Sequence, residues 1–444
     1  MKIDSGSTAW LLTSTALVLL MTPGLAFFYG GMSRAKSVLN MMMMSFVSIA
    51  VVSMVWVVYG YSLAFTDGGG LNSFIGGLGD WGLVGLETSA TLDDGTGIPS
   101  LVFVAFQATF AIITVALISG AIADRAKFGA WVVFTLIWVT IVYLPIAHWV
   151  WFFGPEDGEG GWIGAGVGAL DFAGGTVVHI NAGAAALALA LVLGKRKGWP
   201  REPMRPHNLP FVLLGAGLLW FGWFGFNAGS ALGANGTAAV AFINTLVATG
   251  AAGFAWIVVE KIRDGSSTTL GIASGVVAGL VAVTPACAFI TPLGAIVLGL
   301  VAGAVCALAV SLKYKLGYDD SLDVVGVHLV GGVIGALLIG ILATTAVNEA
   351  GADGLLAGGG VGLLGKQAIA VVATIAYSFI VTFIIGKVLD LTMGFRIGEE
   401  DEVSGIDSVA HAETAYDFGS IHGGGAGSSS AAPVGSAQKV EADA

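Results

Sequence analysis

Two short stretches of this sequence decide the fold. Residues 171–183 read DFAGGTVVHINAG, and residues 323–332 read DVVGVHLVGG. Each stretch has an aspartate, then a histidine (His179 or His328) followed by small residues, and each opens a long apolar segment without further charges. Ionisable groups inside membrane segments are costly and rare, so a repeated pattern of them indicates a functional site built from an internal repeat.

Apolar segments free of charge recur along the chain, and each is long enough for a helix of about 20 residues that crosses a bilayer. We predict eleven such helices. They lie within residues 4–34, 36–67, 94–124, 127–156, 171–195, 205–260 (two helices, with a turn at 233–236), 264–313 (two helices, with a break near Pro292), 323–349 and 366–390.

The two histidines fall in the fifth and tenth of these helices, which run in opposite directions. At 1.5 Å of rise per residue, His179 lies about 12 Å from Asp171 and His328 about 7.5 Å from Asp323 along their helices. Both histidines therefore approach the middle of the bilayer, from opposite faces. We predict an all-α membrane protein with an inverted repeat of helices 1–5 and 6–10.

The composition agrees with a membrane protein and excludes a soluble or disordered one. Only 11% of the 444 residues are charged against 56% hydrophobic, and the mean hydropathy is +0.88. The 68 glycines suit helices that pack closely in a membrane. The net charge of -11 argues against nucleic acid as a partner.

Lysine and arginine set the predicted orientation. Loops 1–2, 3–4, 5–6, 7–8 and 9–10 hold thirteen of them, whereas the opposite loops hold only Lys2 and Lys366. We expect a multi-pass protein of the plasma membrane, with the N-terminus outside and the C-terminus cytoplasmic. Residues 1–396 would form the membrane domain, and residues 397–444, with nine acidic residues and one lysine, an acidic cytoplasmic tail that is disordered toward its end.

Paired histidines at the centre of a membrane are open to four interpretations. They could be structural, each bonded to a neighbouring helix. They could be the two axial ligands of a haem, or part of a metal site that lacks a third ligand. They could also form a proton relay or a hydrogen-bonding rail for a small polar substrate, because neutral imidazole both donates and accepts.

Aromatic residues gather near the predicted outer ends of several helices, among them Phe110, Trp151 and Phe226, with the hydroxyl of Ser230 nearby. Such residues often form a belt at the membrane interface. Aromatic faces beside a hydroxyl also attract a small cation, and that chemistry suits ammonium. The patterns G-x-S-x-G, H-E-x-x-H and the P-loop are absent from the sequence, which argues against a hydrolase.

Several longer motifs resemble those of the Amt/MEP/Rh group of ammonium transporters, on the Amt side. The resemblance covers all but about the last two dozen residues. It rests on residues 23–31 (PGLAFFYGG), 171–181, 195–197 (KRK), 206–210 (PHNLP), 222–230 (GWFGFNAGS), 284–287 (TPAC), 323–328 and 390–394 (DLTMG).

This resemblance implies a homotrimer with one pore in each subunit and no cofactor or metal. Trp151, Phe110 and Ser230 resemble the outer site that recruits ammonium, and Phe110 and Phe226 the stacked gate below it. His179 and His328 resemble the twin histidines of a hydrophobic pore. Asp171 resembles the buried carboxylate that supports deprotonation, Thr284 a polar group near the pore, and Phe28 a residue of the middle or inner lining.

The implied function is uptake of ammonium, with methylammonium as an analogue: the ion loses its proton and ammonia passes the histidines. We expect net transport of charge, with a neutral ammonia channel and an ammonium sensor as alternatives. The tail residues Gly405, Asp407 and Tyr416 resemble the family's regulatory tail, which cooperates with a PII-type (GlnK-like) signal protein at the cytoplasmic face.

Overall fold

The computed structural model describes residues 2–87, 91–92, 95–154 and 160–416, and the outer part of the predicted tail, residues 417–444, lies outside them. Ten helices are long and apolar enough to cross a membrane, and the shorter Thr269–Val283 supplies the eighth predicted position. The predicted all-helical membrane fold is confirmed. An apolar chain forms helices in lipid because every backbone polar group must find a partner within its own segment.

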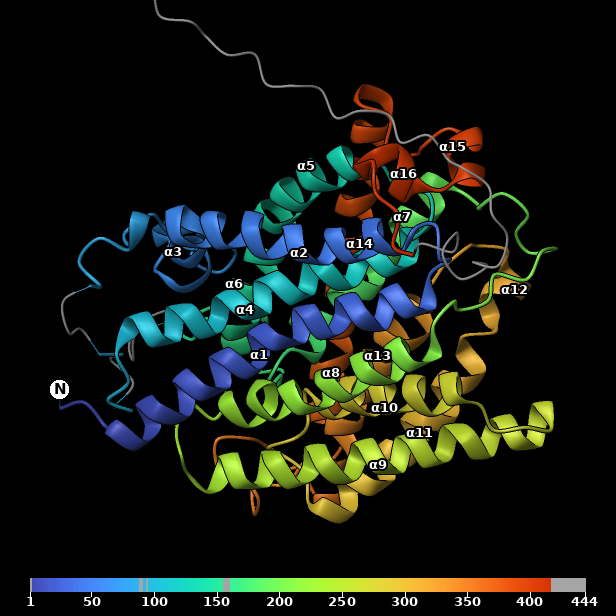
Figure 1. The fold of residues 1–444 in the computed structure, drawn as a ribbon. Helices are drawn as coiled ribbons and strands as arrows, with labels where there is room; N and C mark the ends of the chain where they lie inside the picture. The colour runs from blue at the N-terminus through green and yellow to red at the C-terminus, as the bar shows by residue number, and fades with distance from the viewer. Residues whose placement is uncertain (1, 88–90, 93–94, 155–159, 417–444) are drawn as a thin grey trace, which may run out of the picture.

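The helices form one bundle, with most of them running roughly parallel or antiparallel (Figure 1). The first half contains α1 (Ser5–Met32), α2 (Val38–Val55), α3 (Tyr61–Phe65), α4 (Ser100–Ile118), α5 (Phe128–Trp138), α6 (Leu144–Trp151) and α7 (Asn181–Leu193). The second half contains α8 (Leu209–Gly229), α9 (Gly236–Asp264), α10 (Thr269–Val283), α11 (Pro292–Ala309), α12 (Leu312–Leu316), α13 (Val330–Leu342) and α14 (Gly362–Thr392).

Several crossing helices contain a π-helical segment, in which the chain takes wider turns than an α-helix. Trp56–Gly60 (η1) joins α2 to α3, and Val139–Tyr143 (η5) joins α5 to α6. Gly175–Ile180 (η7) precedes α7, and Val325–Leu329 (η8) precedes α13. The two repeat halves therefore place a π-helix at the same point, and each of these two carries one of the predicted histidines.

Short polar caps fix where several helices of the second half begin. The side chain of Asn235 accepts a hydrogen bond from the backbone N–H of Ala238, which starts α9 directly after the predicted turn at 233–236. Thr291 caps α11 in the same way, and Pro292 follows as its first residue. Proline suits that position because its missing N–H would have had no partner in the helix. The predicted break near Pro292 is therefore the start of α11.

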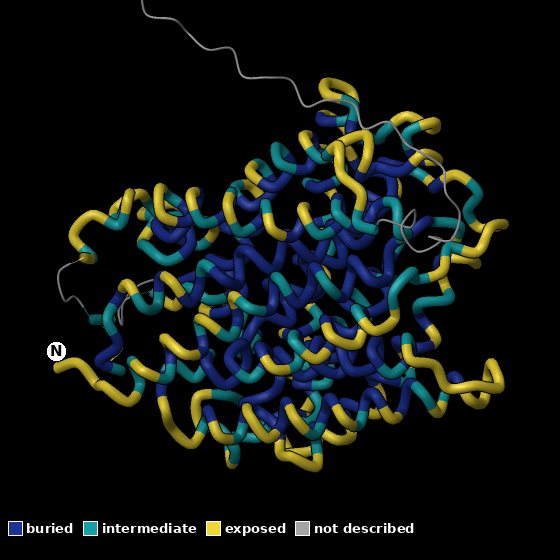
Figure 2. The backbone as a smooth tube through the Cα atoms, in the orientation of Figure 1, coloured by how far each residue is buried: buried dark blue, intermediate teal, exposed yellow. Residues whose placement is uncertain are grey.

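Small residues allow the two halves to approach closely. A side-chain carbon added at Gly215 in α8 would lie 2.3 Å from the backbone nitrogen of Phe28 in α1. The centre of the bundle is buried, whereas exposed residues follow its outer surface (Figure 2). Many of those exposed residues are large and apolar, such as Phe221, Phe254 and Val372. An outer surface with so many exposed apolar side chains is suited to contact with lipid.

The bundle has two faces, which we name by the chain ends that lie on them. The N-terminal face holds Asp4, the N-cap of α1. The tail face holds α15 (Glu399–Ser404) and α16 (Ile406–His411), which lie at the other end of the molecule from the N-terminus (Figure 1). Because the number of crossing helices is odd, the N-terminal residues and the tail lie on opposite faces of the bundle.

Candidate functional site: a pore with twin histidines

His179 and His328 face each other in the buried centre of the bundle. Their Nδ1 atoms are 3.2 Å apart, and the ring centroids are 5.3 Å apart at an interplanar angle of 25°. The two rings border a cavity of about 10 Å³ whose wall also contains Phe28, Phe226 and Leu219. That volume corresponds to about one water-sized probe. The residues of the repeat therefore meet around a space that fits one very small molecule.

The contact between the rings limits what the pair can do. A hydrogen bond between two Nδ1 atoms needs a proton on one ring only, so one histidine donates while the other accepts. The Nε2 atom of His179 is buried and has no hydrogen-bond partner within the described part of the chain. It is therefore available to a small polar guest in the cavity.

A haem does not fit between these histidines, because the space beside them is far smaller than a porphyrin. The described residues contain no group of three or more histidine, cysteine, aspartate or glutamate side chains that could hold a metal ion. Of the four interpretations of the pair, the structural one and the hydrogen-bonding rail remain compatible with this geometry.

Trp223 fixes the orientation of His179. The indole stacks on the imidazole with centroids 5.3 Å apart and an interplanar angle of 19°. Its N–H donates to the hydroxyl of Thr284 at 2.8 Å, and that hydroxyl donates to the carbonyl oxygen of Leu280 at 2.7 Å. Thr284 therefore contacts the histidine pair through Trp223, and not directly.

Two stacked phenylalanines lie between the histidine pair and the residues toward the N-terminal face. The rings of Phe110 and Phe226 lie 4.1 Å apart at 24°, and both side chains are fully buried. Trp151 packs edge-on against Phe110 at 5.7 Å. The ring of Phe226 also lies 6.2 Å from His179, so the aromatic pair leads directly to the histidines.

A cavity of about 560 Å³ opens above the phenylalanines, and we call it the N-face cavity. Trp151, Ser230 and Asp171 line it, together with Gln107 and Lys366. The hydroxyl of Ser230 donates to the carbonyl oxygen of Phe226 at 2.8 Å, and the indole of Trp151 donates to the carbonyl oxygen of Asp171 at 3.0 Å. The structure thus brings together the predicted recruitment residues, with Phe110 directly beneath Trp151.

Asp171 holds the start of η7 in place. Its carboxylate accepts four backbone hydrogen bonds, from Gly174 and Gly175 at 2.8 Å, Thr176 at 2.7 Å and Val177 at 3.1 Å. A carboxylate at this end of a helix also meets the positive end of the helix dipole. Asp171 is therefore both the cap of the helix that carries His179 and a negative charge at the floor of the N-face cavity.

The same arrangement recurs in the second half, but with Asp320 in place of the Asp323 that the sequence pattern suggested. The carboxylate of Asp320 accepts from the backbone N–H groups of Val324 at 3.1 Å and Val325 at 2.7 Å, at the start of η8. Asp171 and Asp320 are each eight residues before their histidine, so the two halves repeat at a separation of 149 residues.

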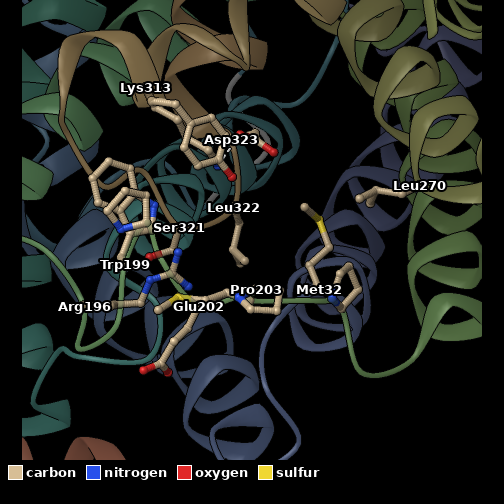
Figure 3. A pocket seen from close by; sticks show the side chains of 14 residues that line it. Met32, Arg196, Trp199, Glu202, Pro203, Leu270, Lys313, Ser321, Leu322 and Asp323 are labelled. Atoms are coloured by element: carbon tan, nitrogen blue, oxygen red, sulfur yellow. Dashed lines mark hydrogen bonds and ion pairs between the residues drawn. The ribbon is translucent and has the colours of Figure 1, made fainter. Parts of the chain in front are cut away.

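A second cavity of about 210 Å³ lies at the tail face, and we call it the tail-face cavity (Figure 3). Met32, Leu322 and Asp323 line it, together with Trp199 and Lys313. Met32 lies one turn beyond Phe28 in α1, and Asp323 lies just before η8. The tail-face cavity therefore follows the small histidine cavity along the same two helices.

Buried ion pairs join the loops around this cavity. Asp319 contacts Arg196 at 2.9 Å and Arg125 at 3.9 Å, and Asp124 contacts Arg196 and Arg34 at 3.1 Å each. Burial alone would raise the pKa of Asp319, but hydrogen bonds from Arg196 and the charge of Arg125 outweigh it and leave the pKa below its usual value of 3.8. Asp319 is therefore held as a carboxylate.

The tail is docked against the same loops through carboxylates of its own. Asp407 accepts from the backbone N–H groups of Leu39 at 3.0 Å and Asn40 at 2.8 Å. Its pKa is raised by burial, although these two hydrogen bonds offset part of the rise. The Tyr416 hydroxyl lies 2.8 Å from Nε2 of His207.

Two further tail residues fix this position. The backbone of Gly405 has a positive φ of 121°, and a side chain added there would lie 2.7 Å from Lys36. The buried side chain of Glu402 accepts from the backbone N–H of Lys197 at 2.7 Å and pairs with Arg396 at 2.7 Å.

His148 is a buried residue that the sequence reasoning missed. Its Nδ1 atom lies 2.9 Å from the carbonyl oxygen of Ala64, and its Nε2 atom 2.6 Å from that of Asn72. It thereby joins α6, which carries Trp151, to the end of α3 and to the loop that follows. Its only signal in the sequence was a lone histidine before a tryptophan, without a counterpart in the repeat.

Comparisons with known proteins show the family to which this chain belongs. The model of the Ammonium Transporter Family matches residues 9–416. An ammonium transporter of Mycobacterium bovis is 56% identical over 94% of this chain and 91% of its own length. The crystal structure of Mep2 from Candida albicans is 34% identical, with a TM-score of 0.82 over 90% of this chain and 88% of that one. A solved sensor Amt protein is 28% identical, with a TM-score of 0.83 over 92% of this chain and 98% of that one. A match over nearly the whole length, together with a buried histidine pair behind stacked phenylalanines, shows that this chain is a multi-pass membrane protein of the Ammonium Transporter Family.

Proposed function

We propose that this protein takes up ammonium through a pore that runs from the N-face cavity, past Phe110 and Phe226, to the histidine pair and the tail-face cavity. The observation that carries the proposal is the cavity of about 10 Å³ beside the histidines, which lies behind the stacked rings of Phe110 and Phe226. A hydrated ion is too large for that space, whereas a single ammonia molecule is of the right size.

Recruitment begins at the N-face cavity. The face of Trp151 attracts a small cation, and the oxygen of Ser230 can accept a hydrogen bond from it. The carboxylate of Asp171 adds a negative field below, without direct contact being needed. Methylammonium has the same charge and keeps all but one of the N–H donors of ammonium, so we propose it as a transported analogue.

Passage then requires the ion to lose its proton. A bare cation in an apolar constriction is costly, whereas neutral ammonia is not. Ammonia therefore crosses beside His179 and His328, whose ring nitrogens replace its bonds to water. The hydrogen bond between the two rings offers the proton a route as well, and we propose that it follows and that transport is electrogenic.

The test is the current across a solid-supported membrane with the purified protein after a jump in ammonium. We expect a transient current in the natural protein and none in a His179→Ala, His328→Ala double variant. His207→Ala serves as the control, because that histidine lies at the docked tail. Alkalinisation inside vesicles without any current would instead establish a neutral ammonia channel. Absence of both signals would contradict transport and favour a sensor.

We propose the orientation, the regulation by the tail and the oligomeric state from the sequence and from the contacts of the docked tail. We infer from the positively charged loops that the tail face lies in the cytoplasm, and we propose that ammonium moves inward to supply the cell with nitrogen. The residues 397–444 would regulate the pore, with Gly405, Asp407 and Tyr416 holding the tail beside the tail-face cavity for a PII-type (GlnK-like) partner. We also propose a homotrimer with one pore in each subunit, which chemical cross-linking in the native membrane would test.

A further inference from the structure

The surroundings of the capping aspartate differ between the two halves of the repeat. Asp171 and Asp320 both cap a π-helix that carries a pore histidine, and the third residue after each has a positive φ. That residue is Gly174 in the first half, with φ of 117°, and Asp323 in the second, with φ of 64°. A glycine at one position and a carboxylate at its counterpart give the two mouths of the pore opposite chemistry.

The mouth at the N-terminal face has no resident cation against its carboxylate. Asp171 forms no ion pair with the residues that the structure describes. Lys366 lines the same cavity, but it is exposed at the surface. Beside Gly174 stands the ring of Trp151, 3.4 Å from where a side-chain carbon would be. The negative charge of this mouth is therefore left for a cation that arrives from solution.

The mouth at the tail face already contains a cation. The ammonium group of Lys313 donates to a carboxylate oxygen of Asp323 at 2.6 Å and to the backbone carbonyl oxygen of Asp320 at 2.9 Å. Its side chain is only 8% exposed. Figure 3 shows Lys313 and Asp323 side by side in the wall of the tail-face cavity. A lysine head group carries the same charge as an ammonium ion and offers three N–H donors.

We propose that Lys313 is a built-in ammonium group that fills the tail-face counterpart of the recruitment site. Because it satisfies Asp323 and lies against Asp320, this mouth does not retain a free ammonium ion. Ammonia that takes up a proton at the tail face forms an ammonium ion that leaves this mouth. Ammonium ions that approach from the tail side bind there poorly. The affinity for cations is therefore unequal at the two mouths, while the direction of net flow still follows the gradient.

The two buried arginines near Lys313 have partners of their own. Arg196 pairs with Asp319 and Asp124, and Arg125 pairs with Asp319. Tyr314 lies beneath the lysine, with its ring centre 5.5 Å from the ammonium nitrogen. Neutralising Lys313 would thus leave Asp323 and Asp320 with no other cation paired to either carboxylate among the described residues.

The inference rests on the proposed function, but its test measures the binding of a cation and not transport. Crystals of the natural protein and of Lys313→Gln are soaked in rubidium chloride at pH 8, and the anomalous signal locates the metal. Rubidium is an ammonium-sized cation. The pH lies above the pKa of about 6 to which burial raises Asp320. We expect a peak beside Asp323 in Lys313→Gln and none there in the natural protein.

Lys313→Arg is the matched control, because it keeps the positive charge and should keep the site closed. Lys313→Met repeats the test should the glutamine variant not fold. A rubidium peak beside Asp323 in the natural protein would contradict the inference, as would its absence in a folded neutral variant. Either result leaves the current measurement for transport unaffected, so the two proposals fail separately.

A second test measures how ammonium on the tail side inhibits transport. In vesicles, uptake of radiolabelled methylammonium by Lys313→Gln should be inhibited by ammonium on the tail side at a concentration about tenfold lower than in Lys313→Arg, since the unpaired carboxylate now binds it. Equal inhibition of both variants would overturn the proposed role.

Discussion

The indole N–H of Trp223 donates to the hydroxyl of Thr284, and the same indole stacks on His179. Thr284, the C-cap residue of α10, therefore determines how His179 is held, although His179 lies in η7. We expect Thr284→Val to leave a buried N–H without a partner, at a cost of about 1–3 kcal/mol. Transport of methylammonium should fall by about fivefold or more.

Thr284→Ser is the control for this change, because serine keeps the hydroxyl and should keep most of the activity. The measurement is the maximal uptake rate in vesicles at matched protein levels. Full activity in the valine variant would show that Trp223 is held by packing alone.

The stacked pair of Phe110 and Phe226 should set the selectivity for ammonium. In Phe226→Ala the constriction widens, so water enters and the cost of passing a bare cation falls. We expect a potassium-driven current that the natural protein lacks, and an unfolding free energy lower by about 3–5 kcal/mol. The current on a supported membrane after a potassium jump tests this.

Phe224→Ala offers a matched control for the gate. Phe224 stacks on Phe242 at the same centroid distance of 4.1 Å but outside the pore. This variant should lose a similar contact and still reject potassium. A potassium current in both variants would point to general loosening of the bundle.

His148 should fasten the loop that follows α3 beside the N-face cavity. His148→Phe keeps the stacked contact with Phe152 but removes both contacts to the carbonyl oxygens of Ala64 and Asn72. We expect faster hydrogen exchange in residues 66–80 and a higher KM for methylammonium, with a smaller change in the maximal rate. Exchange followed by mass spectrometry gives the first readout, and unchanged protection of this loop would contradict the role.

Asp319 should stabilise the tail face at neutral pH and lose this effect in acid. Its pKa is lower in the folded protein than the usual 3.8, so the stabilisation is present above that value and disappears as the pH falls through the folded pKa. Asp319→Asn breaks buried ion pairs, and we expect a loss of about 3–5 kcal/mol at pH 7. Unfolding midpoints of the two proteins should differ by a constant amount from pH 7 down to about pH 4 and begin to approach each other below pH 3.8. A gap that narrows already at neutral pH would contradict this.

Gly405 should be required for docking of the tail. Alanine there meets both the positive φ of 121° and the close approach of Lys36. We expect Gly405→Ala to release α15 and α16 and to make residues 397–416 far more sensitive to protease. Gly398→Ala is the control, because its nearest neighbour would be an ordinary 3.5 Å away. Equal protection in both variants would contradict the docked arrangement.

Much of this molecule could be predicted from its sequence because charges are so scarce. The residues that interrupt the apolar segments mark the helix ends, and caps such as Asn235 and Thr291 act locally. His179 and His328 stood out because an ionisable group in a membrane segment is rarely accidental. Contacts between segments far apart in the sequence could not be predicted, such as the contact of Tyr416 with His207.

Other features escaped for physical reasons. The sequence pattern aligned Asp323 with Asp171, whereas the equal spacing of eight residues to each histidine would have chosen Asp320. Thr284 looked like a pore residue, and only the packing reveals that Trp223 lies between it and His179. The predicted depths of the histidines assumed α-helical rise, and nothing in the composition of residues 175–180 signals a π-helix.

These π-helices also have a consequence for how the protein can evolve. A π-turn contains one residue more than an α-turn, and one residue rotates a regular helix by about 100°. Loss of a single residue from η7 or η8 would turn His179 or His328 away from its partner while leaving every side chain chemically intact. Insertions and deletions in η7 and η8 are therefore not tolerated, whatever the effect of a single substitution, so related sequences should keep the length of these segments.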